Sequence, residues 1–265
     1  MRCPVSLKIV VAVKYVPDAT GDRHFSEDLT TDRDAVDGLL SELDEYAVEQ
    51  ALRIAEACDD AETTVLTVGP EDARDALRKA LSMGADKAVH VEDDALHGTD
   101  VMGTSLVLAK AVEHIGYDLV MCGMASTDGT MGVLPALLAE RLGVSQMTLL
   151  SDVSVADGKV SGRRDGDSAD EELEASLPAV VSVTDRSGEA RYPSFKGIMA
   201  AKKKPVKSVD LSDLGIGEER VGLIGAWTKV EEAAQRAPRT SGTVVKDEGE
   251  GSKQLAEFLA GQKFI

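Results

Sequence analysis

A run of glycines and small polar residues lies near the middle of the chain. It reads Gly-Met-Ala-Ser-Thr-Asp-Gly-Thr-Met-Gly over Gly123–Gly132, and a helical pattern follows over Val133–Leu142. Glycine lets a backbone turn tightly and approach a ligand. The N-terminus of the following helix offers unpaired N–H groups and a positive dipole end, which together suit a phosphate. The segment predicts an anion-binding loop, although a plain strand-to-helix connection fits the same residues.

Groupings of residues typical of catalysis do not occur in the sequence. There is neither a Gly-x-Ser-x-Gly elbow nor a phosphate-binding loop with the usual lysine. The four histidines are scattered and form no HxxxH or HExxH pair, so no metal site is expected. Cys122 has no histidine near it in the sequence, and we expect it to pack in the core.

A basic segment, Arg191–Lys204 (RYPSFKGIMAAKKK), contrasts with the formal net charge of −18. Two interpretations fit it. The lysines suit the C-terminal end of a solvated helix. Alternatively, the segment is an exposed docking loop in which Phe195 enters an apolar pocket of a partner, with the lysines beside it.

Strand and helix patterns alternate through the first half of the chain. Continuous apolar runs predict strands at Lys8–Val13, Thr63–Val68, Lys87–Val91 and Asp118–Cys122, and helical spacing predicts helices at Asp44–Cys58, Glu71–Met83, Thr99–Ile115 and Val133–Leu142. Crossovers of helical length give parallel strands with helices on both faces. We expect an α/β fold with a doubly wound, mostly parallel, Rossmann-like sheet.

Ligands of such sheets bind outside the carboxyl ends of the strands, where the strand order reverses. The segments at these ends are Val13–Asp18, Ser41–Glu45, Val68–Pro70 and Gly123–Gly132. The glycine-rich loop is therefore expected at the ligand-binding edge.

The pattern changes after residue 147. Short strands at Ser151–Val155, Lys159–Arg163 and Leu173–Ala175 predict an added β-hairpin region, and Pro178–Val183 predicts a further buried strand. Thr228–Gln235 fits a short helix, 236–251 has linker composition, and Ser252–Phe264 predicts an amphipathic helix. We expect one α/β domain over 1–225, and a linker with a C-terminal helical arm over 226–265. Such an arm needs the main domain or a partner to pack on.

The composition excludes several classes of protein. Hydrophobic residues make up 43% of the 265 residues, which is enough for a core. The charge of −18 disfavours binding to nucleic acid and to anionic membranes. No apolar run approaches the roughly 20 residues of a membrane span, and the N-terminus does not have the pattern of a signal peptide. Three cysteines without a CxxC pair predict no disulfide framework, and hence a cytoplasmic protein.

The sequence resembles the beta subunits of electron-transfer flavoproteins. The matching segments, which together cover residues 7 to about 205 in order, are Val11–Asp18, Asp44–Glu56, Val68–Asp86, Asp118–Gly143 and Ala190–Lys204. The resemblance implies a heterodimer with an alpha subunit that carries a redox-active FAD, while the beta subunit forms a wall of that site and buries an AMP. It also implies an electron carrier rather than an enzyme. Electrons would come from acyl-CoA and other dehydrogenases, as in fatty acid oxidation, and pass to a quinone oxidoreductase.

The resemblance assigns two sets of residues. The nucleotide site comprises Ala12, Ser41, Glu42, Leu43, Asp44, Val68, Gly123, Met124, Ala125, Ser126, Thr127, Asp128, Gly129, Thr130, Met131, Gly132, Val133 and Leu134. The partner-binding set comprises Arg191, Tyr192, Phe195, Ile198, Met199 and Lys202. The C-terminal arm would pack on the alpha subunit. At Ser41-Glu42 and Val133-Leu134 the chain departs from the family pattern, so backbone contacts are expected there.

Two alternatives stay open at this point. In electron-bifurcating relatives a second FAD replaces the AMP. A stand-alone, adenine-nucleotide-binding stress-type protein of similar architecture would be a homo-oligomer without an alpha partner.

Overall fold

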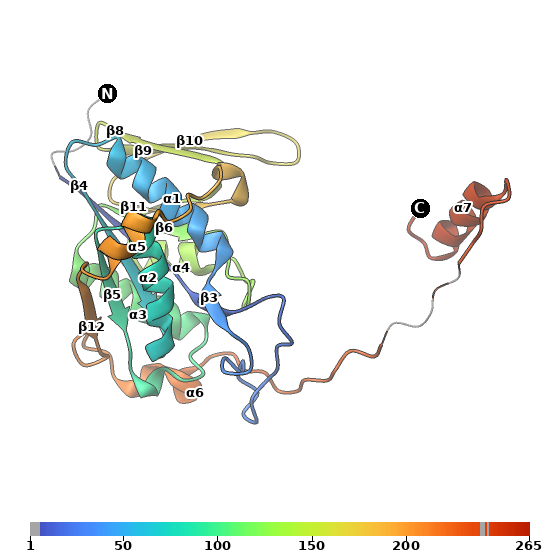
Figure 1. The fold of residues 1–265 in the computed structure, drawn as a ribbon, viewed down its shortest axis with the longest axis horizontal. Coiled ribbons are helices and arrows are strands. Elements are labelled where there is room, and N and C mark those ends of the chain that lie inside the picture. The colour runs from blue at the N-terminus through green and yellow to red at the C-terminus, as the bar shows by residue number, and fades with distance from the viewer. Residues whose placement is uncertain (1–5, 239–241, 243) are drawn as a thin grey trace. The chain divides into compact units, whose positions relative to one another are not determined.

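The computed structural model describes residues 6–238, 242 and 244–265, and its central feature is a sheet of seven parallel strands (Figure 1). From one edge to the other the strands are β12 (Val206–Val209), β5 (Lys87–Val91), β4 (Ala61–Val68), β1 (Leu7–Ala12), β6 (Leu119–Gly123), β11 (Ala179–Val183) and β7 (Ser145–Leu150). The chain runs from β1 through β4 to β5 on one side and then returns to β6 on the other. The strand order therefore reverses at β1.

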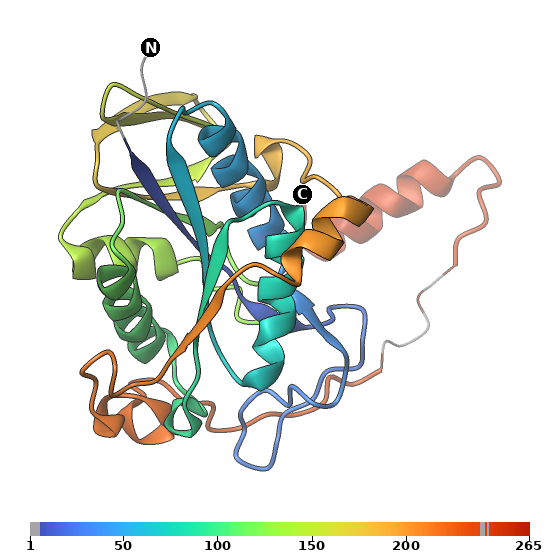
Figure 2. The same ribbon diagram turned by 60° about the vertical axis from the view of Figure 1, so that its left-hand side comes forward.

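Helices cover both faces of this sheet (Figure 2). The longer helices of the sheet region are α1 (Glu42–Glu56), α2 (Arg74–Met83), α3 (Val101–Ile115) and α4 (Leu134–Leu142). Ile9 and Val11 of β1 belong to the hydrophobic cluster that contains α1 and α2, while Val10 belongs to the cluster that contains α3 and α4. Successive side chains of a strand point to opposite faces, so the sheet is doubly wound and Rossmann-like, as predicted.

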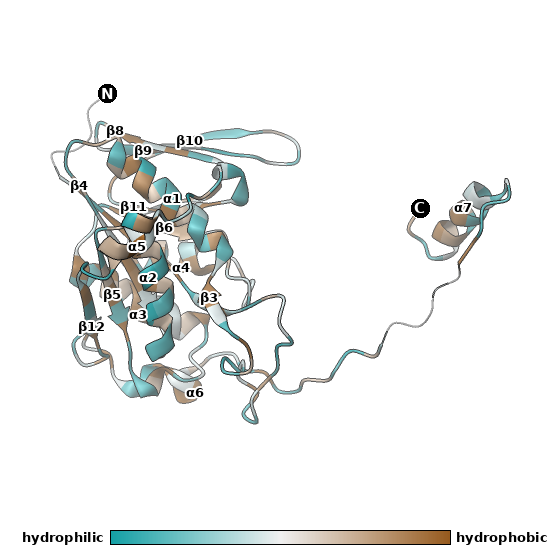
Figure 3. Ribbon diagram, viewed as in Figure 1, coloured by the Kyte–Doolittle hydropathy of each residue, from teal (hydrophilic) through white to brown (hydrophobic). Residues whose placement is uncertain are grey.

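Smaller elements are added to this core. A three-stranded antiparallel sheet contains β8 (Asp152–Ala156), β9 (Lys159–Arg164) and β10 (Glu171–Ser176), and β2 (Tyr15–Pro17) pairs with β3 (Gly38–Leu40). Two short helices follow, α5 (Phe195–Ala201) and α6 (Gly222–Gly225). Hydropathy separates the two regions, because the central strands are hydrophobic whereas the β10 hairpin is largely hydrophilic (Figure 3). The β-hairpin region expected from the sequence is confirmed.

The chain divides into two compact units after Glu231. The smaller unit contains one helix among its described residues, α7 (Gly251–Gly261), close to the predicted range. Leu255 and Phe258 of this helix are exposed. No helix in the described part of the chain is long and apolar enough to cross a membrane.

Two expectations from the sequence are wrong. The helix predicted over Thr228–Gln235 is absent from these residues. These residues are exposed, so no buried apolar face favours a helix there. At the start of the range, the backbone N–H groups of Trp227 and Thr228 donate to the Asp100 carboxylate. The absence of a disulfide is also contradicted, because Cys58 is disulfide-bonded. Cysteine spacing along the sequence does not report which thiols meet in the fold. Cys122 is free and buried, as expected.

Candidate functional site

The carboxyl ends of β1 and β6 lie side by side at the point where the strand order reverses. Val11 pairs with Met121, so Ala12 and Gly123 end neighbouring strands. The chain leaves β1 toward α1 on one face and leaves β6 toward α4 on the other. This divergence opens the crevice in which α/β sheets of this type bind their ligands.

Asp44, in the first turn of α1, ties the two strand ends together. Its buried carboxylate accepts hydrogen bonds from the backbone N–H groups of Lys14, at 2.8 Å, and of Gly123. A Cβ atom on Gly123 would lie 2.5 Å from the Asp44 carboxylate and 2.7 Å from the Leu43 carbonyl, so only glycine fits. Burial raises the pKa of Asp44 to about 7, although both hydrogen bonds and the charge of Lys14 act in the opposite direction.

A second buried carboxylate, Asp128, fixes the glycine-rich loop to the segment after β1. It accepts hydrogen bonds from Lys14 Nζ at 2.9 Å and from Arg33 Nη2 at 3.0 Å. Burial alone would raise the pKa of Asp128, but Lys14, Ser126 and Arg33 hold it well below its usual range. Lys14 and Arg33 thus face one charged carboxylate, Asp128, while the nearby Asp44 is partly protonated at neutral pH. Two cations at the loop are a feature that suits a phosphate.

The outer part of the loop is open to solvent. Residues 129–133 are exposed, including the apolar side chains of Met131 and Val133. Gly132 has a φ of 66°, a conformation that glycine adopts without strain, and the loop then enters α4. No side-chain hydrogen bond from Val133 caps the helix, and Pro135 has no N–H, so the N–H groups of Leu134 and Ala136 are the ones left for other partners in the first turn.

Two hydroxyl groups at the same edge of the sheet are buried without a partner. Ser41 Oγ, directly before α1, and Thr67 Oγ1, near the end of β4, have no hydrogen-bond partner within the described ranges. Buried polar atoms nearly always have one, and a ligand or ordered water is a common explanation where the protein supplies none. These two hydroxyls fit a polar ligand at the crevice.

The structure brings most of the predicted nucleotide-site residues together. Ala12, Ser41, Glu42, Leu43 and Asp44 lie at the end of β1 and the start of α1. Gly123, Met124, Ala125, Ser126, Thr127, Asp128, Gly129, Thr130, Met131, Gly132, Val133 and Leu134 run from the end of β6 to the start of α4. Val68 lies at the same edge but beyond β1, because β4 and β6 flank β1 on opposite sides.

Three cations that contact the loop were not among the predicted site residues. Lys14 and Arg33 bind Asp128, and Arg23 Nη1 donates to the Thr127 carbonyl at 3.1 Å. Lys14 gave one usable signal, since it directly follows a buried strand that ends at the crevice. Arg23 and Arg33 lie in a long loop without a motif, and only the fold places them.

The predicted partner-binding residues divide into exposed and engaged ones. Tyr192 and Phe195 are 92% and 81% exposed, and Ile198, Met199 and Lys202 are also exposed. Arg191 is engaged inside the chain, where its guanidinium binds the carboxylates of Glu49 and Glu56 on α1. Those carboxylates raise the pKa of Arg191. Its assignment to a partner stays a prediction.

Helix α5, which carries the exposed residues, packs closely against α2. A Cβ atom on Gly197 would lie 2.5 Å from the Ser82 carbonyl, so α5 and α2 are in close contact. Lys204 Nζ donates to the carbonyls of Gly84, at 2.9 Å, and Ala85, at 2.6 Å, just beyond the end of α2. Of the two interpretations of this segment, the lysines do lie at and after the end of a helix, and Lys204 holds that end in place.

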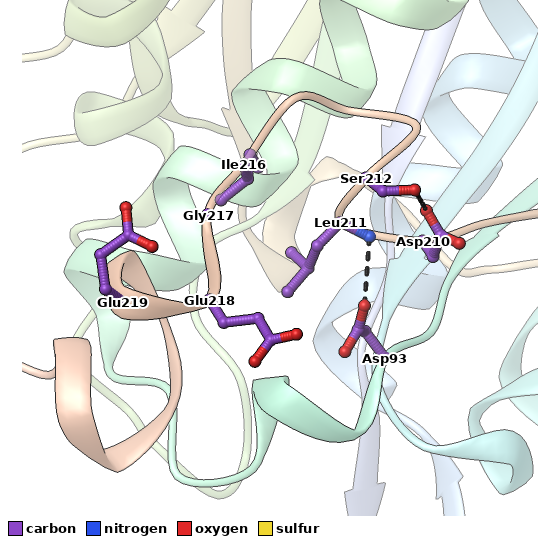
Figure 4. Close-up of a pocket in the computed structure, with 8 residues that line it drawn as sticks. All are labelled: Asp93, Asp210, Leu211, Ser212, Ile216, Gly217, Glu218 and Glu219. Carbon is purple, nitrogen blue, oxygen red and sulfur yellow. Dashed lines mark hydrogen bonds between the residues drawn. The ribbon is translucent and has the colours of Figure 1, made fainter.

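An acidic hollow of about 460 Å³ lies elsewhere in the larger unit, lined by residues that include Asp93, Asp210, Glu218 and Glu219 (Figure 4). Asp93 accepts a hydrogen bond from the backbone of Leu211, and Asp210 accepts one from the Ser212 hydroxyl. No group of three His, Cys, Asp or Glu residues in the described part of the chain could hold a metal ion. The hollow is not assigned a function.

The fold and the crevice define a class of protein, the Rossmann-like α/β proteins with a glycine-rich loop at the strand-order reversal. Comparison with known proteins is more specific. The profile of the electron transfer flavoprotein domain matches residues 28–214. The chain is 49% identical to "Electron transfer flavoprotein subunit beta" of Mycobacterium bovis, over 97% of this chain and 99% of that protein. It is 30% identical to the protein of the same name from Megasphaera elsdenii, over 98% and 100%. The chain belongs to the electron transfer flavoprotein family, as a beta subunit.

Proposed function

We propose that this beta subunit binds AMP at the crevice and supplies one wall of an FAD site held mainly by an alpha subunit. The observation that carries the proposal is the loop from Gly123 to Val133, which the Lys14–Asp128–Arg33 group fixes at the sheet edge while its outer residues stay exposed. An adenine nucleotide suits the inner side, where Lys14 and Arg33 lie. A second subunit suits the exposed apolar side chains of Met131 and Val133.

Each group of the crevice has a defined part in this proposal. Lys14 and Arg33 balance the phosphate charge, and the free N–H groups at the start of α4 are donors to it. The Ser41 hydroxyl gives a further polar contact, and Gly123 lets the start of α1 pack directly against the end of β6. FAD, when bound, supplies the electron-accepting chemistry, so the side chains of this chain act by binding, orienting and excluding water.

The partners follow from the same proposal. Acyl-CoA or other dehydrogenases would dock at the exposed face of α5 and deliver electrons, which a quinone oxidoreductase would accept. The helical arm after residue 226 would pack on the alpha subunit, which suits the exposed apolar residues of α7. The domain division at residue 225 and the cytoplasmic location stay predictions, and the disulfide at Cys58 removes the cysteine argument for the latter.

The cofactor content of the purified heterodimer tests the proposal. We expect one FAD, measured by absorbance, and one AMP, released by denaturation and measured by chromatography. Two flavins and reduction by NADH would instead identify a bifurcating subunit. A stable homo-oligomer that forms no complex with the alpha chain would contradict the heterodimer.

A lysine substitution tests the crevice itself. Lys14→Met removes one of the two cations that hold Asp128, and we expect the AMP content to fall at least about tenfold, since each lost charge-assisted hydrogen bond is worth about 1.5–3 kcal/mol. Lys110→Met is the matched control, because Lys110 forms only an exposed ion pair with Glu113 on α3. Equal AMP content in both variants would exclude the crevice as the nucleotide site.

A further inference from the structure

His90, a buried residue of β5, has one ring nitrogen with a partner and one without. Its side chain is fully buried, and Nε2 lies 3.0 Å from the carbonyl oxygen of Gly69, the residue after β4. A carbonyl oxygen only accepts hydrogen bonds, so Nε2 carries the hydrogen and Nδ1 is the acceptor of the neutral ring. Nδ1 is buried and has no hydrogen-bond partner among the described residues. A buried polar atom left in this way needs an explanation.

The unpaired nitrogen faces the carboxylate of Glu92, the residue that follows β5. His90 Nδ1 lies 3.4 Å from Glu92 Oε2, and the same oxygen lies 3.3 Å from Nη2 of Arg74, the first residue of α2. Side chains from a strand and a helix therefore meet at one oxygen. While the ring is neutral, Nδ1 has no hydrogen to donate, so of the two only Arg74 binds the carboxylate.

The neighbours of the ring on the adjoining strands carry no charge. Thr67 of β4 and Ser208 of β12 are paired in register with His90, so the three side chains point to the same face of the sheet. The Ser208 hydroxyl accepts a hydrogen bond from Arg74 Nη2 at 3.1 Å, which places this face under the start of α2. Glu92 and Arg74 are therefore the charged groups that act on the ring.

These surroundings keep the ring neutral at pH 7. Burial lowers the pKa of His90 below its ordinary value of 6.5, and the charge of Arg74 acts in the same direction. The Gly69 carbonyl and the Glu92 carboxylate act in the opposite direction, because both favour the protonated ring. The ring should therefore take up a proton only in mildly acidic solution, and Glu92 is the group that can then receive the new N–H.

We propose that His90, Glu92 and Arg74 form a proton-operated latch between β5 and the start of α2. In the neutral state Glu92 binds Arg74 and joins the sheet to the helix. In the protonated state the Nδ1–H group donates to Glu92 Oε2, and the carboxylate then pairs with its own strand instead. A buried imidazolium needs a paired carboxylate, so the exchange of partners follows from the burial of the ring. The proton has a route from solvent, since the Glu92 side chain is 35% exposed.

The latch acts on the first turn of α2. Arg74 keeps its contact with Ser208 when it loses Glu92, so one of its two side-chain links to the sheet remains. Both members of the Arg74–Glu92 ion pair are more than a third exposed, so its loss should loosen this turn only modestly. Helix α5 contacts α2 near Ser82, at the other end of the helix. A change of pH is therefore expected to act on the turn between β4 and α2, and not on α5.

Nuclear magnetic resonance of the full-length chain with 15N-labelled histidine rings tests the latch. The chain has four histidines, and a His90→Gln variant identifies the His90 signal by its loss. We expect the Nε2–H tautomer at about pH 8 and a titration midpoint below 6.5. A ring that stays neutral down to about pH 5 would overturn the proposal, because Glu92 would then not stabilise the imidazolium.

Two substitutions should move the midpoint in opposite directions. Glu92→Gln removes the charge that favours the imidazolium and should lower the midpoint by about one pH unit, whereas Arg74→Gln should raise it. His97 is the control in the same spectra, because it pairs with a different carboxylate, that of Asp28, at 2.7 Å. Equal shifts of the His90 and His97 signals in the Glu92→Gln protein would indicate a general effect and overturn the latch.

Hydrogen exchange follows the change of partners itself. Between about pH 7.5 and about pH 5.5, the protection factors of amides in the first turn of α2 should fall about threefold in the wild type, as expected for the loss of a partly exposed ion pair. They should stay constant in His90→Gln, which cannot take up the proton. A His90 titration that responds to Glu92 while these protection factors stay unchanged would mean that Glu92 does not leave Arg74, and it would also overturn the latch. Thermal unfolding at about pH 7.5 checks that each variant is folded.

Discussion

Asp44 and Asp128 are two buried carboxylates at one crevice, and their surroundings move their pKa values in opposite directions. Asp128 has cationic partners on both sides and a pKa well below the usual range. Asp44 is buried to a similar extent but has backbone donors instead of ion pairs, and its pKa is raised to about 7. Divergent pKa values at one site are typical of functional regions. Here they mean that Asp44 changes its protonation near neutral pH while Asp128 stays charged.

The stability of the fold should depend on pH through Asp44. Its pKa is about 7 in the folded state and has its ordinary value of 3.8 in the unfolded chain, so the folded state holds the proton more tightly. The resulting stabilisation is fully present below about pH 4 and is lost as the pH rises through about 7. Asp44→Asn cannot titrate, so the melting temperature of the wild type should fall relative to the variant between about pH 5 and pH 8. Parallel melting curves across this range would contradict the prediction.

Gly123 should not tolerate a side chain. A methyl group there meets the Asp44 carboxylate and the Leu43 carbonyl, so Gly123→Ala should destabilise the fold by about 1–3 kcal/mol and reduce nucleotide content. Gly129→Ala is the control on the same loop, because its Cβ would lie 3.4 Å from Ser126 Oγ, an ordinary contact. Urea unfolding measures both. Equal stability of the two variants would exclude the close packing at Gly123.

At the scale of residues, the sequence predicted the glycine-rich loop but not the side chains that fix it in place. Glycines and a following helix are visible in a short stretch of sequence. The contacts of Lys14 and Arg33 with Asp128 join residues 114 and 95 positions apart. No local pattern encodes such a pair, and long polar side chains are common in a chain this charged.

Among the elements, the close contact of α5 with α2 fixes the orientation of the exposed docking residues. Gly197→Ala places a methyl group against the Ser82 carbonyl and should displace α5. We expect kcat/KM with a dehydrogenase to fall about tenfold, since misplacing a docking surface by about 1 Å is costly. The flavin spectrum should stay unchanged, because α5 and the crevice are separate parts of the fold. An altered spectrum would contradict this separation.

The strands were predicted correctly where burial gives the sequence a clear pattern. β1, β4, β5 and β6 are buried runs of apolar residues, and the predicted bounds differ from the observed ones by at most two residues. Two strands were not predicted. β12 is an edge strand with three exposed residues of four, and β7 has an irregular alternation of buried and exposed residues. For α5 the lysines indicated a helix end as one of two interpretations, but no bounds followed, because the helix spans only seven residues and contains a glycine at its contact with α2.

For the whole molecule, the two units should be separable. The hydrophobic clusters of the larger unit extend no further along the chain than Val221 among the described residues. A chain that ends at Glu231 should keep its free energy of unfolding within about 0.5 kcal/mol of the full chain, as for changes outside a core. It should also lose affinity for the alpha subunit, which size-exclusion chromatography measures. Unchanged heterodimer formation would contradict the proposed role of α7.

The basic segment Arg191–Lys204 begins and ends at residues that bind other parts of the larger unit. Arg191 is fixed by two carboxylates of α1, and Lys204 by carbonyls at the end of α2. Substitutions between these two points can change the outer surface while both attachments remain. The stretch from residue 192 to 203 can therefore diverge between species, or be exchanged by engineering, to match a new electron donor without rebuilding the protein beneath it.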